Sequence, residues 1–168
     1  MVRSTTSATD RQRHREPQPR RSDRRAELLN GLLALNHDAR EGYAKAAELA
    51  ESTTLKGLFE RAMLERAAFA RALRPLVKDA GGDPDDDGTL DGSMHRLWMQ
   101  VREKLSSDGD TALVNECERA EDQAVKAYRR ALDADLPAPI HAVLDLQAKR
   151  VFAVHDALSD MKHGRQPT

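Results

Sequence analysis

Apolar residues recur at helical spacing in four long segments of this chain. Within each segment, apolar and small side chains return every three or four positions, which places them on one face of an amphipathic helix. The predicted helices run over residues 24–51, over 55–80, from a break at 106–110 to about 133, and from a turn at 136–139 to about 162. The pattern therefore predicts an all-α protein with four long helices.

The segments between these helices predict how they are connected. Ser22 or Asp23 is expected to cap the first helix, and Ser52 begins a tight turn into the second. Gly81 and Gly82 end the second helix, and an acidic stretch then leads to a shorter helix over 93–105. Two helical hairpins joined by a long crossover with a short extra helix are typical of a ferritin-like four-helix bundle.

Composition supports this interpretation and limits the class of protein. The chain has 168 residues, of which 33% are charged and 4% aromatic, a mixture that favours long helices over sheets. It contains no run of 18 apolar residues, so we expect no membrane span. No apolar segment follows the basic N-terminus, and the single cysteine, Cys117, falls on an apolar helix face. These features predict a cytoplasmic protein.

Arginine is concentrated near the N-terminus. Residues 1–25 contain eight arginines and three acidic residues, with almost nothing apolar, so residues 1–23 are expected to be a disordered tail. The predicted bundle covers residues 24–164, and residues 165–168 form a C-terminal tail. A basic arm over 1–25 could bind nucleic acid through its phosphates. The favoured alternative is a solvated extension, or residues added by an upstream start codon, because no aromatic residues are interleaved for base stacking.

Three stretches resemble a known family. They are DAREGY at 38–43, GSMHRLW at 92–98 and NECERAEDQAVKAYRRAL at 115–132, of which NECERAED is the most specific. Over residues 27 to about 161 the chain resembles bacterial ferritin-like four-helix-bundle proteins that are catalogued as a domain of unknown function. The resemblance implies the ferritin-like fold and carries no assigned activity.

Four polar residues fall on the inward faces of the four long helices. They are Asn36, Arg66, Glu121 and Gln147. Counted from the connections at about 1.5 Å per residue, they lie within roughly one and a half helical turns of each other. A buried carboxylate needs a partner, and the guanidinium of Arg66 matches the carboxylate of Glu121. We predict one buried polar network in which these two residues pair.

The residues that a di-iron centre requires are missing from these faces. Such a centre takes carboxylates from two helices and a Glu-x-x-His pair from each of the other two. Here Glu65 is followed by Ala68 in place of histidine, and Gln147 is followed by Arg150. The first helix has no inward acid. We therefore predict a polar layer without metal and no resident cofactor.

A second inward group consists of Tyr43, Cys117 and His155, placed nearer the first turn than the polar layer. An inward histidine is more often a hydrogen-bonded core residue than a ligand, and a thiol on an apolar face is usually inert. The alternative is a mononuclear or partial site for iron or another transition metal. Its candidate ligands are Glu65, Glu118, Glu121 and His155.

Catalytic motifs are absent from the sequence. It contains no Gly-rich phosphate loop, no CxxC pair and no Ser/His/Asp set at plausible spacing, so no residue is predicted to be catalytic. The main prediction is a non-enzymatic binding or stress-associated module that acts through a protein partner or self-association. The alternatives are a di-iron-type oxidoreductase or iron-handling protein with an unorthodox site, and nucleic-acid binding through the basic arm.

Overall fold

The computed structural model describes residues 20–85 and 92–164, and for residues 92–95 it describes the backbone alone. This part of the chain forms five helices and no strand, which confirms the all-α prediction. The helices are α1 (Arg21–Leu49), α2 (Thr53–Asp79), α3 (Gly92–Asp108), α4 (Asp110–Leu132) and α5 (Ala138–Lys162).

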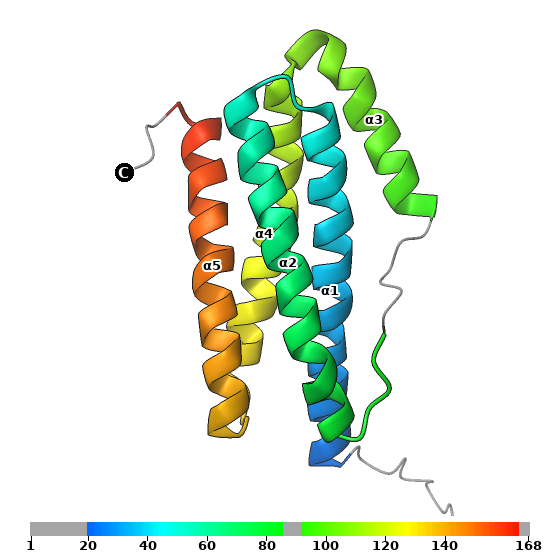
Figure 1. The fold of residues 1–168 in the computed structure, drawn as a ribbon, viewed down its shortest axis with the longest axis vertical. Helices are drawn as coiled ribbons and strands as arrows, with labels where there is room; N and C mark the ends of the chain where they lie inside the picture. Colours follow the sequence, from blue (N-terminus) through cyan, green and yellow to red (C-terminus); the bar gives the residue numbers. More distant parts are fainter. Residues whose placement is uncertain (1–19, 86–91, 165–168) are drawn as a thin grey trace, which may run out of the picture.

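The four long helices pack as two antiparallel hairpins (Figure 1). One hairpin is α1 with α2 and the other is α4 with α5; between hairpins, α1 packs against α4 and α2 against α5. Helix α3 lies outside this group and returns the chain to the end of the molecule where α2 begins (Figure 1). As a result α4 runs in the same direction as α2, its diagonal neighbour.

Helix α1 begins three residues earlier than predicted, and neither Ser22 nor Asp23 is its cap. The first residue before the helix is Arg20, whose backbone N–H donates to the Asp23 carboxylate at 3.0 Å. An acid in the first turn also suits the positive end of the helix dipole. Asp23 therefore stabilises the helix from inside its first turn.

Helix α3 runs through the serines that were expected to break it. The hydroxyls of Ser106 and Ser107 donate to the carbonyls of Glu103 and Lys104 at 2.9 and 3.1 Å, so these side chains bond within the helix. The break falls at Gly109, whose φ of 54° lies in the left-handed region that glycine adopts at low cost.

Asp110, the first residue of α4, ties the two hairpins together. Its carboxylate accepts hydrogen bonds from the backbone N–H groups of Glu51 and Ser52, at 2.9 and 2.7 Å. The α1–α2 turn is therefore capped from the other hairpin. Ser52 in turn caps α2, accepting from the Leu55 N–H at 3.3 Å, in agreement with the prediction.

Asn30 fixes the start of the crossover on α1. Its side-chain amide donates to the carbonyl of Asp83 at 2.6 Å and accepts from the N–H of Asp85 at 2.8 Å. The Asn30 side chain thus satisfies two backbone groups, a C=O and an N–H, that would otherwise bond to water.

The buried apolar residues form two clusters. One contains Leu29 and Leu33 of α1 with Leu73 and Val77 of α2, and the other contains Phe59 with Leu113 of α4. On α1, α2 and α4, the stretch between the two clusters carries a buried polar residue: Asn36, Arg66 and Glu121 respectively. A polar layer therefore separates the two halves of the core.

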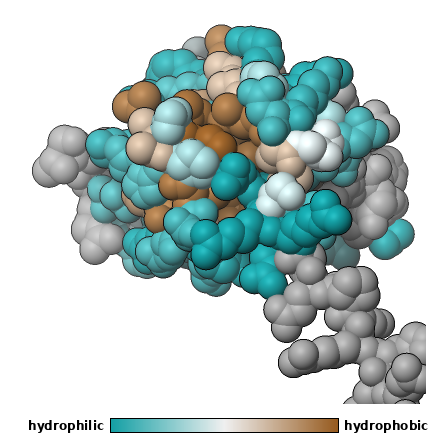
Figure 2. All heavy atoms as spheres, turned by 90° about the horizontal axis from the view of Figure 1, so that it is seen from below, coloured by the Kyte–Doolittle hydropathy of each residue, from teal (hydrophilic) through white to brown (hydrophobic). Residues whose placement is uncertain are grey.

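The core reaches the surface at the end of the molecule where α1 begins and α4 ends. Figure 2 shows apolar surface in the middle of this end, ringed by hydrophilic residues. Partly buried residues from the helix ends pack onto the core here, among them Leu28, Leu132, Leu136 and Ile140. In the described part of the chain, no helix combines the length and apolar character needed to span a membrane.

Candidate functional site

Arg66 and Glu121 form an ion pair at the centre of the molecule. Each residue is 2% exposed, and Nη2 of Arg66 lies 2.6 Å from Oε2 of Glu121 and also donates to Oε1. The other guanidinium nitrogen, Nη1, donates to Oδ1 of Asn36 at 3.1 Å. Arg66 therefore reaches from α2 to both α1 and α4.

Two tyrosines complete this network. Tyr43 donates to Oε1 of Glu121 at 2.5 Å, and Nδ2 of Asn36 donates to the hydroxyl of Tyr128 at 2.8 Å. Tyr128 donates in turn to Oε1 of Gln147 at 2.8 Å. We call these six residues, Asn36, Tyr43, Arg66, Glu121, Tyr128 and Gln147, the central layer. All four long helices contribute to it.

The contacts between α1 and α4 in this layer are reciprocal. Each helix carries an amide or carboxylate and, seven residues later, a tyrosine: Asn36 and Tyr43 on α1, Glu121 and Tyr128 on α4. Because the helices are antiparallel, each tyrosine meets the other helix's polar residue. Seven residues are two turns, so both members of each pair share one helix face.

Burial and neighbouring charges keep Tyr43, Tyr128 and Arg66 of the layer protonated. Burial alone would lower the pKa of Arg66, but Glu121 and the neighbouring tyrosines raise it. Burial, together with Glu121, raises the pKa of Tyr43 well above its usual value, and burial raises that of Tyr128 to about 12. At neutral pH both tyrosines are therefore O–H donors, and the guanidinium is charged.

Glu65, a candidate metal ligand, lies away from the central layer. Its carboxylate accepts from Arg150 of α5, with Nε at 3.0 Å from Oε1. The Glu65 side chain is 27% exposed and that of Arg150 is 60% exposed. In the sequence, Glu65 occupies the glutamate position of one Glu-x-x-His motif and Arg150 the histidine position of the other. These two residues thus bond to each other across the seam between α2 and α5.

Glu118 and His155, two further candidates, meet at the seam between α4 and α5. Asp122 joins them, and among the described residues these three form a group whose ligand atoms all lie within 4.8 Å of one another. Nε2 of His155 lies 2.8 Å from Oδ1 of Asp122, and Lys162 donates to Oε2 of Glu118 at 2.9 Å. Glu121, the fourth candidate, belongs to the central layer, so the four predicted ligands occupy three places.

His155 lies at a partly exposed seam, with 22% of its side chain accessible. Its second ring nitrogen, Nδ1, lies 3.3 Å from Oδ1 of Asp156. Burial alone would lower the pKa of His155, but hydrogen bonds to Asp156 and Asp122 raise it. Its partners are thus carboxylates of α4 and α5.

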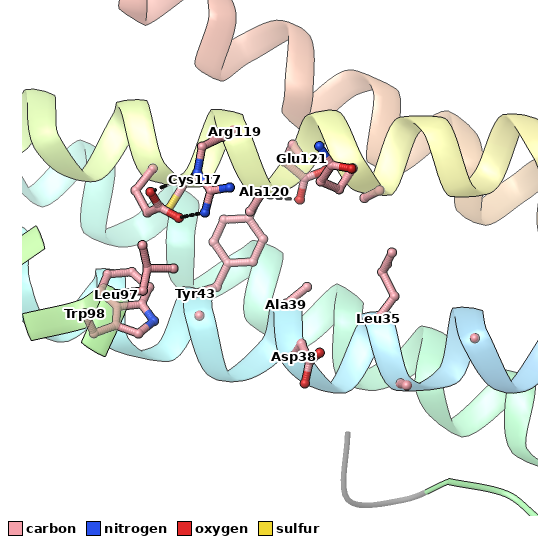
Figure 3. Close-up of a pocket in the computed structure, with 16 residues that line it drawn as sticks. Leu35, Asp38, Ala39, Tyr43, Leu97, Trp98, Cys117, Arg119, Ala120 and Glu121 are labelled. Carbon is pink, nitrogen blue, oxygen red and sulfur yellow. Dashed lines mark hydrogen bonds and ion pairs between the residues drawn. The ribbon is translucent and has the colours of Figure 1, made fainter. Parts of the chain in front are cut away.

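A cavity of about 460 Å³ opens beside the central layer, between α1, α3 and α4 (Figure 3). Tyr43 and Glu121 belong both to the layer and to the cavity lining, and Trp98 of α3 lies at one end. Six of the lining residues are glycine or alanine, namely Gly31, Ala34, Ala39, Gly42, Ala120 and Ala124. The missing side-chain volume of these residues leaves the space open.

Cys117 also lines this cavity. Burial, with added repulsion from Glu116 and Glu121, raises the pKa of its thiol far above the usual range. The thiolate is the nucleophilic form of cysteine, so this environment makes the thiol unreactive at neutral pH.

Residues 25–134 match a family model described as a domain of unknown function (DUF2383). The chain belongs to this family. The DUF2383 region contains Asn36, Tyr43, Arg66, Glu121 and Tyr128, whereas α5, with Gln147 and His155, follows it. No curated protein matches the chain.

The predicted nucleic-acid contact through residues 1–25 falls mostly outside the described residues, which begin at Arg20. Of the N-terminal tail predicted over 1–23, residues 1–19 lie outside them and residues 21–23 belong to α1, and the C-terminal tail predicted over 165–168 also lies outside them. Of the basic arm, the structure describes only the part that starts α1, where Arg21 donates to Asp135 at 3.2 Å.

Proposed function

We propose that this DUF2383 protein is a ferritin-like bundle that acts as a non-enzymatic binding module and takes a small apolar molecule beside its central layer. The connectivity supports the ferritin-like assignment, since two hairpins are joined by a crossover that makes α2 and α4 parallel (Figure 1). The observation that carries the proposal is the position of Arg66. The guanidinium of Arg66 places a positive charge at the centre of the bundle, where a di-iron protein would hold metal ions.

The donor set of the central layer does not fit a di-iron centre. Glu121 is the single carboxylate of the layer, and Arg66 and Tyr43 already donate to its oxygens. A metal ion on Glu121 would displace the guanidinium and leave its charge buried without an anionic partner, at a cost of several kcal/mol. The chemistry of these residues supports a layer that is closed by an ion pair.

The cavity supports the binding role. Its volume of about 460 Å³ lies within the range of small-molecule sites, roughly 300–1,000 Å³. Most of its exposed lining is apolar, although four polar side chains, those of Asp38, Glu116, Arg119 and Gln123, line it together with Tyr43 and Glu121 of the central layer (Figure 3). A neutral, largely apolar molecule suits this lining, because it would displace water without disturbing the ion pair.

Trp98 is the chain's single tryptophan and lines the cavity, so its fluorescence can report binding. Titration with Nile red, a neutral apolar dye, should give saturable quenching of Trp98 with energy transfer to the dye. Ala120→Leu fills the cavity and should weaken binding about tenfold or more. Ala68→Leu places the same substitution on the exposed face of α2 and should leave binding unchanged.

The same titration can overturn the proposal. Quenching that does not saturate, or equal binding by the wild type and by Ala120→Leu, would show that the cavity is no binding site. The circular dichroism of each variant should match that of the wild type, so that a loss of binding is not a loss of fold.

A further inference from the structure

The seam between α4 and α5 brings three metal-ligating side chains to one place. Glu118 and Asp122 are four residues apart on α4, which puts both carboxylates on the same face one turn apart. His155 comes from α5, and the ligand atoms of all three lie within 4.8 Å of one another. Two helices of one hairpin thus present an imidazole and two carboxylates to a common point.

The surroundings of His155 match those of a metal-ligating histidine. Its Nε2 faces Asp122 at 2.8 Å, while Nδ1 lies 3.3 Å from the carboxylate of Asp156. A histidine that binds a metal through one nitrogen usually donates its other N–H to a carboxylate or carbonyl, which fixes the ring. Asp156 is placed to do this for His155.

A cation of the chain already lies on one of the carboxylates. Nζ of Lys162 is 2.9 Å from Oε2 of Glu118, and the Glu118 side chain is only 11% exposed. A carboxylate this buried needs a positive partner. The Lys162 side chain is 39% exposed, so it can swing into solvent when another cation takes its place.

We propose that Glu118, Asp122 and His155 form a site for one divalent transition-metal ion of the Zn²⁺ type, with Lys162 as the cation that the metal displaces. Three protein ligands leave at least one position for water, as in sites with open coordination. The imidazole selects Zn²⁺ and its neighbours in the first row over Mg²⁺ and Ca²⁺, which prefer oxygen ligands. This seam site is separate from the central layer and does not depend on the proposed function.

Binding requires a modest rearrangement of the site. Zinc bonds of about 2.0–2.2 Å place neighbouring tetrahedral ligand atoms roughly 3.4 Å apart. The three ligand atoms lie within 4.8 Å of one another, whereas Nε2 of His155 and Oδ1 of Asp122, at 2.8 Å, must move apart by roughly 0.6 Å when the metal ion replaces their hydrogen bond. Rotation of the Glu118 side chain away from Lys162 would bring its carboxylate to the same metal ion as Asp122 and His155.

Titration of the full-length chain with Zn²⁺ by calorimetry, at near-neutral pH and after treatment with chelator, tests the proposal. We expect one ion per chain with an affinity that falls about tenfold or more in His155→Gln and in Glu118→Gln. Lys162→Met removes the competing cation and should bind Zn²⁺ more tightly than the wild type. Glu65→Gln, which alters a carboxylate at the other seam, should bind as the wild type does, and Mg²⁺ should give no heat at this site.

Co²⁺ provides a second readout, since a nitrogen ligand in a site of low coordination number gives visible absorption bands. These bands should appear in the wild type and be absent in His155→Gln. Equal Zn²⁺ affinity in the wild type and His155→Gln, or weaker binding in Lys162→Met, would overturn the proposal. Dye binding beside Trp98 should persist in His155→Gln, so failure of this site and failure of the apolar cavity are distinguishable.

Discussion

Arg66 and Glu121 lie on diagonally opposite helices, and their charged groups meet at 2.6 Å in the middle of the bundle. Helix α2 belongs to one hairpin and α4 to the other, so the ion pair couples the register of the two hairpins. Sliding either hairpin by one turn, about 5.4 Å, would separate two charges that are each 2% exposed. The pair therefore opposes such slips by the cost of stranding a buried charge.

Cys117 should resist modification in the folded protein. Burial raises the pKa of its thiol, so thiolate is scarce, and the residue is only 5% exposed. We expect Cys117 to react with a disulfide reagent about 100-fold or more slowly in buffer than in denaturant. This expectation applies where locally opened protein closes again faster than the reagent modifies the thiol. A Cys117→Ser, Thr111→Cys variant carries an exposed thiol on the same helix and should react at once. Equal rates for the two native proteins would contradict this account.

Alkaline pH should destabilise the fold through the tyrosines of the central layer. Burial raises the pKa of Tyr128 to about 12 in the folded state, against about 10 when unfolded. Protonated Tyr128 therefore makes its full contribution to the free energy of unfolding below about pH 10. As the pH rises from about 10 through 12, this free energy should fall by about 2–3 kcal/mol. Urea denaturation across this window measures the loss.

Tyr128→Phe provides the control for this pH dependence. It removes the titrating hydroxyl, so its free energy of unfolding should fall less steeply over the same pH window. The variant should start from lower stability, because Asn36 and Gln147 lose a partner. A slope identical to that of the wild type would mean that Tyr128 does not titrate on unfolding.

Two glycine substitutions should have opposite signs. A Cβ at Gly31, within α1, would have nothing within 4 Å, so Gly31→Ala should stabilise by about 0.5–1 kcal/mol. A Cβ at Gly82 would lie 2.9 Å from Cβ of Ala26 and 3.1 Å from Cγ1 of Val77, so Gly82→Ala should destabilise by about 1–3 kcal/mol. Thermal unfolding measures both, and equal shifts would show that the packing around Gly82 is looser than described.

Helical periodicity was sufficient to predict the long helices and the inward positions of the polar residues. Asn36, Arg66, Glu121 and Gln147 are all buried because each falls within an apolar stripe. The helix ends were less predictable. Ser106 and Ser107 are common in breaks, yet here their hydroxyls bond back within α3, and Asp110 caps the opposite hairpin.

Side-chain reach explains the rest of what the sequence did not predict. Tyr43 was placed one level away from Glu121, because a helical wheel locates the Cα atom and not a hydroxyl at the end of a ring. Asp122 is not among the candidate ligands predicted from the sequence, but α5 packs on its side of α4 and brings His155 to it. Pairings of this kind depend on which helices are neighbours, and single-helix periodicity carries no such information.

A double-mutant cycle on Arg66 and Glu121 tests most directly that an ion pair closes the centre of the bundle. Arg66→Met and Glu121→Gln should each cost about 3–5 kcal/mol of unfolding free energy, and the double variant much less than their sum. The matched control is the seam pair, Glu65→Gln with Arg150→Met, whose partly exposed charges should couple by about 1 kcal/mol or less. A coupling energy for Arg66 and Glu121 above that of the control, by about 2 kcal/mol, is the predicted result. Coupling no larger than that of Glu65 with Arg150 would contradict it.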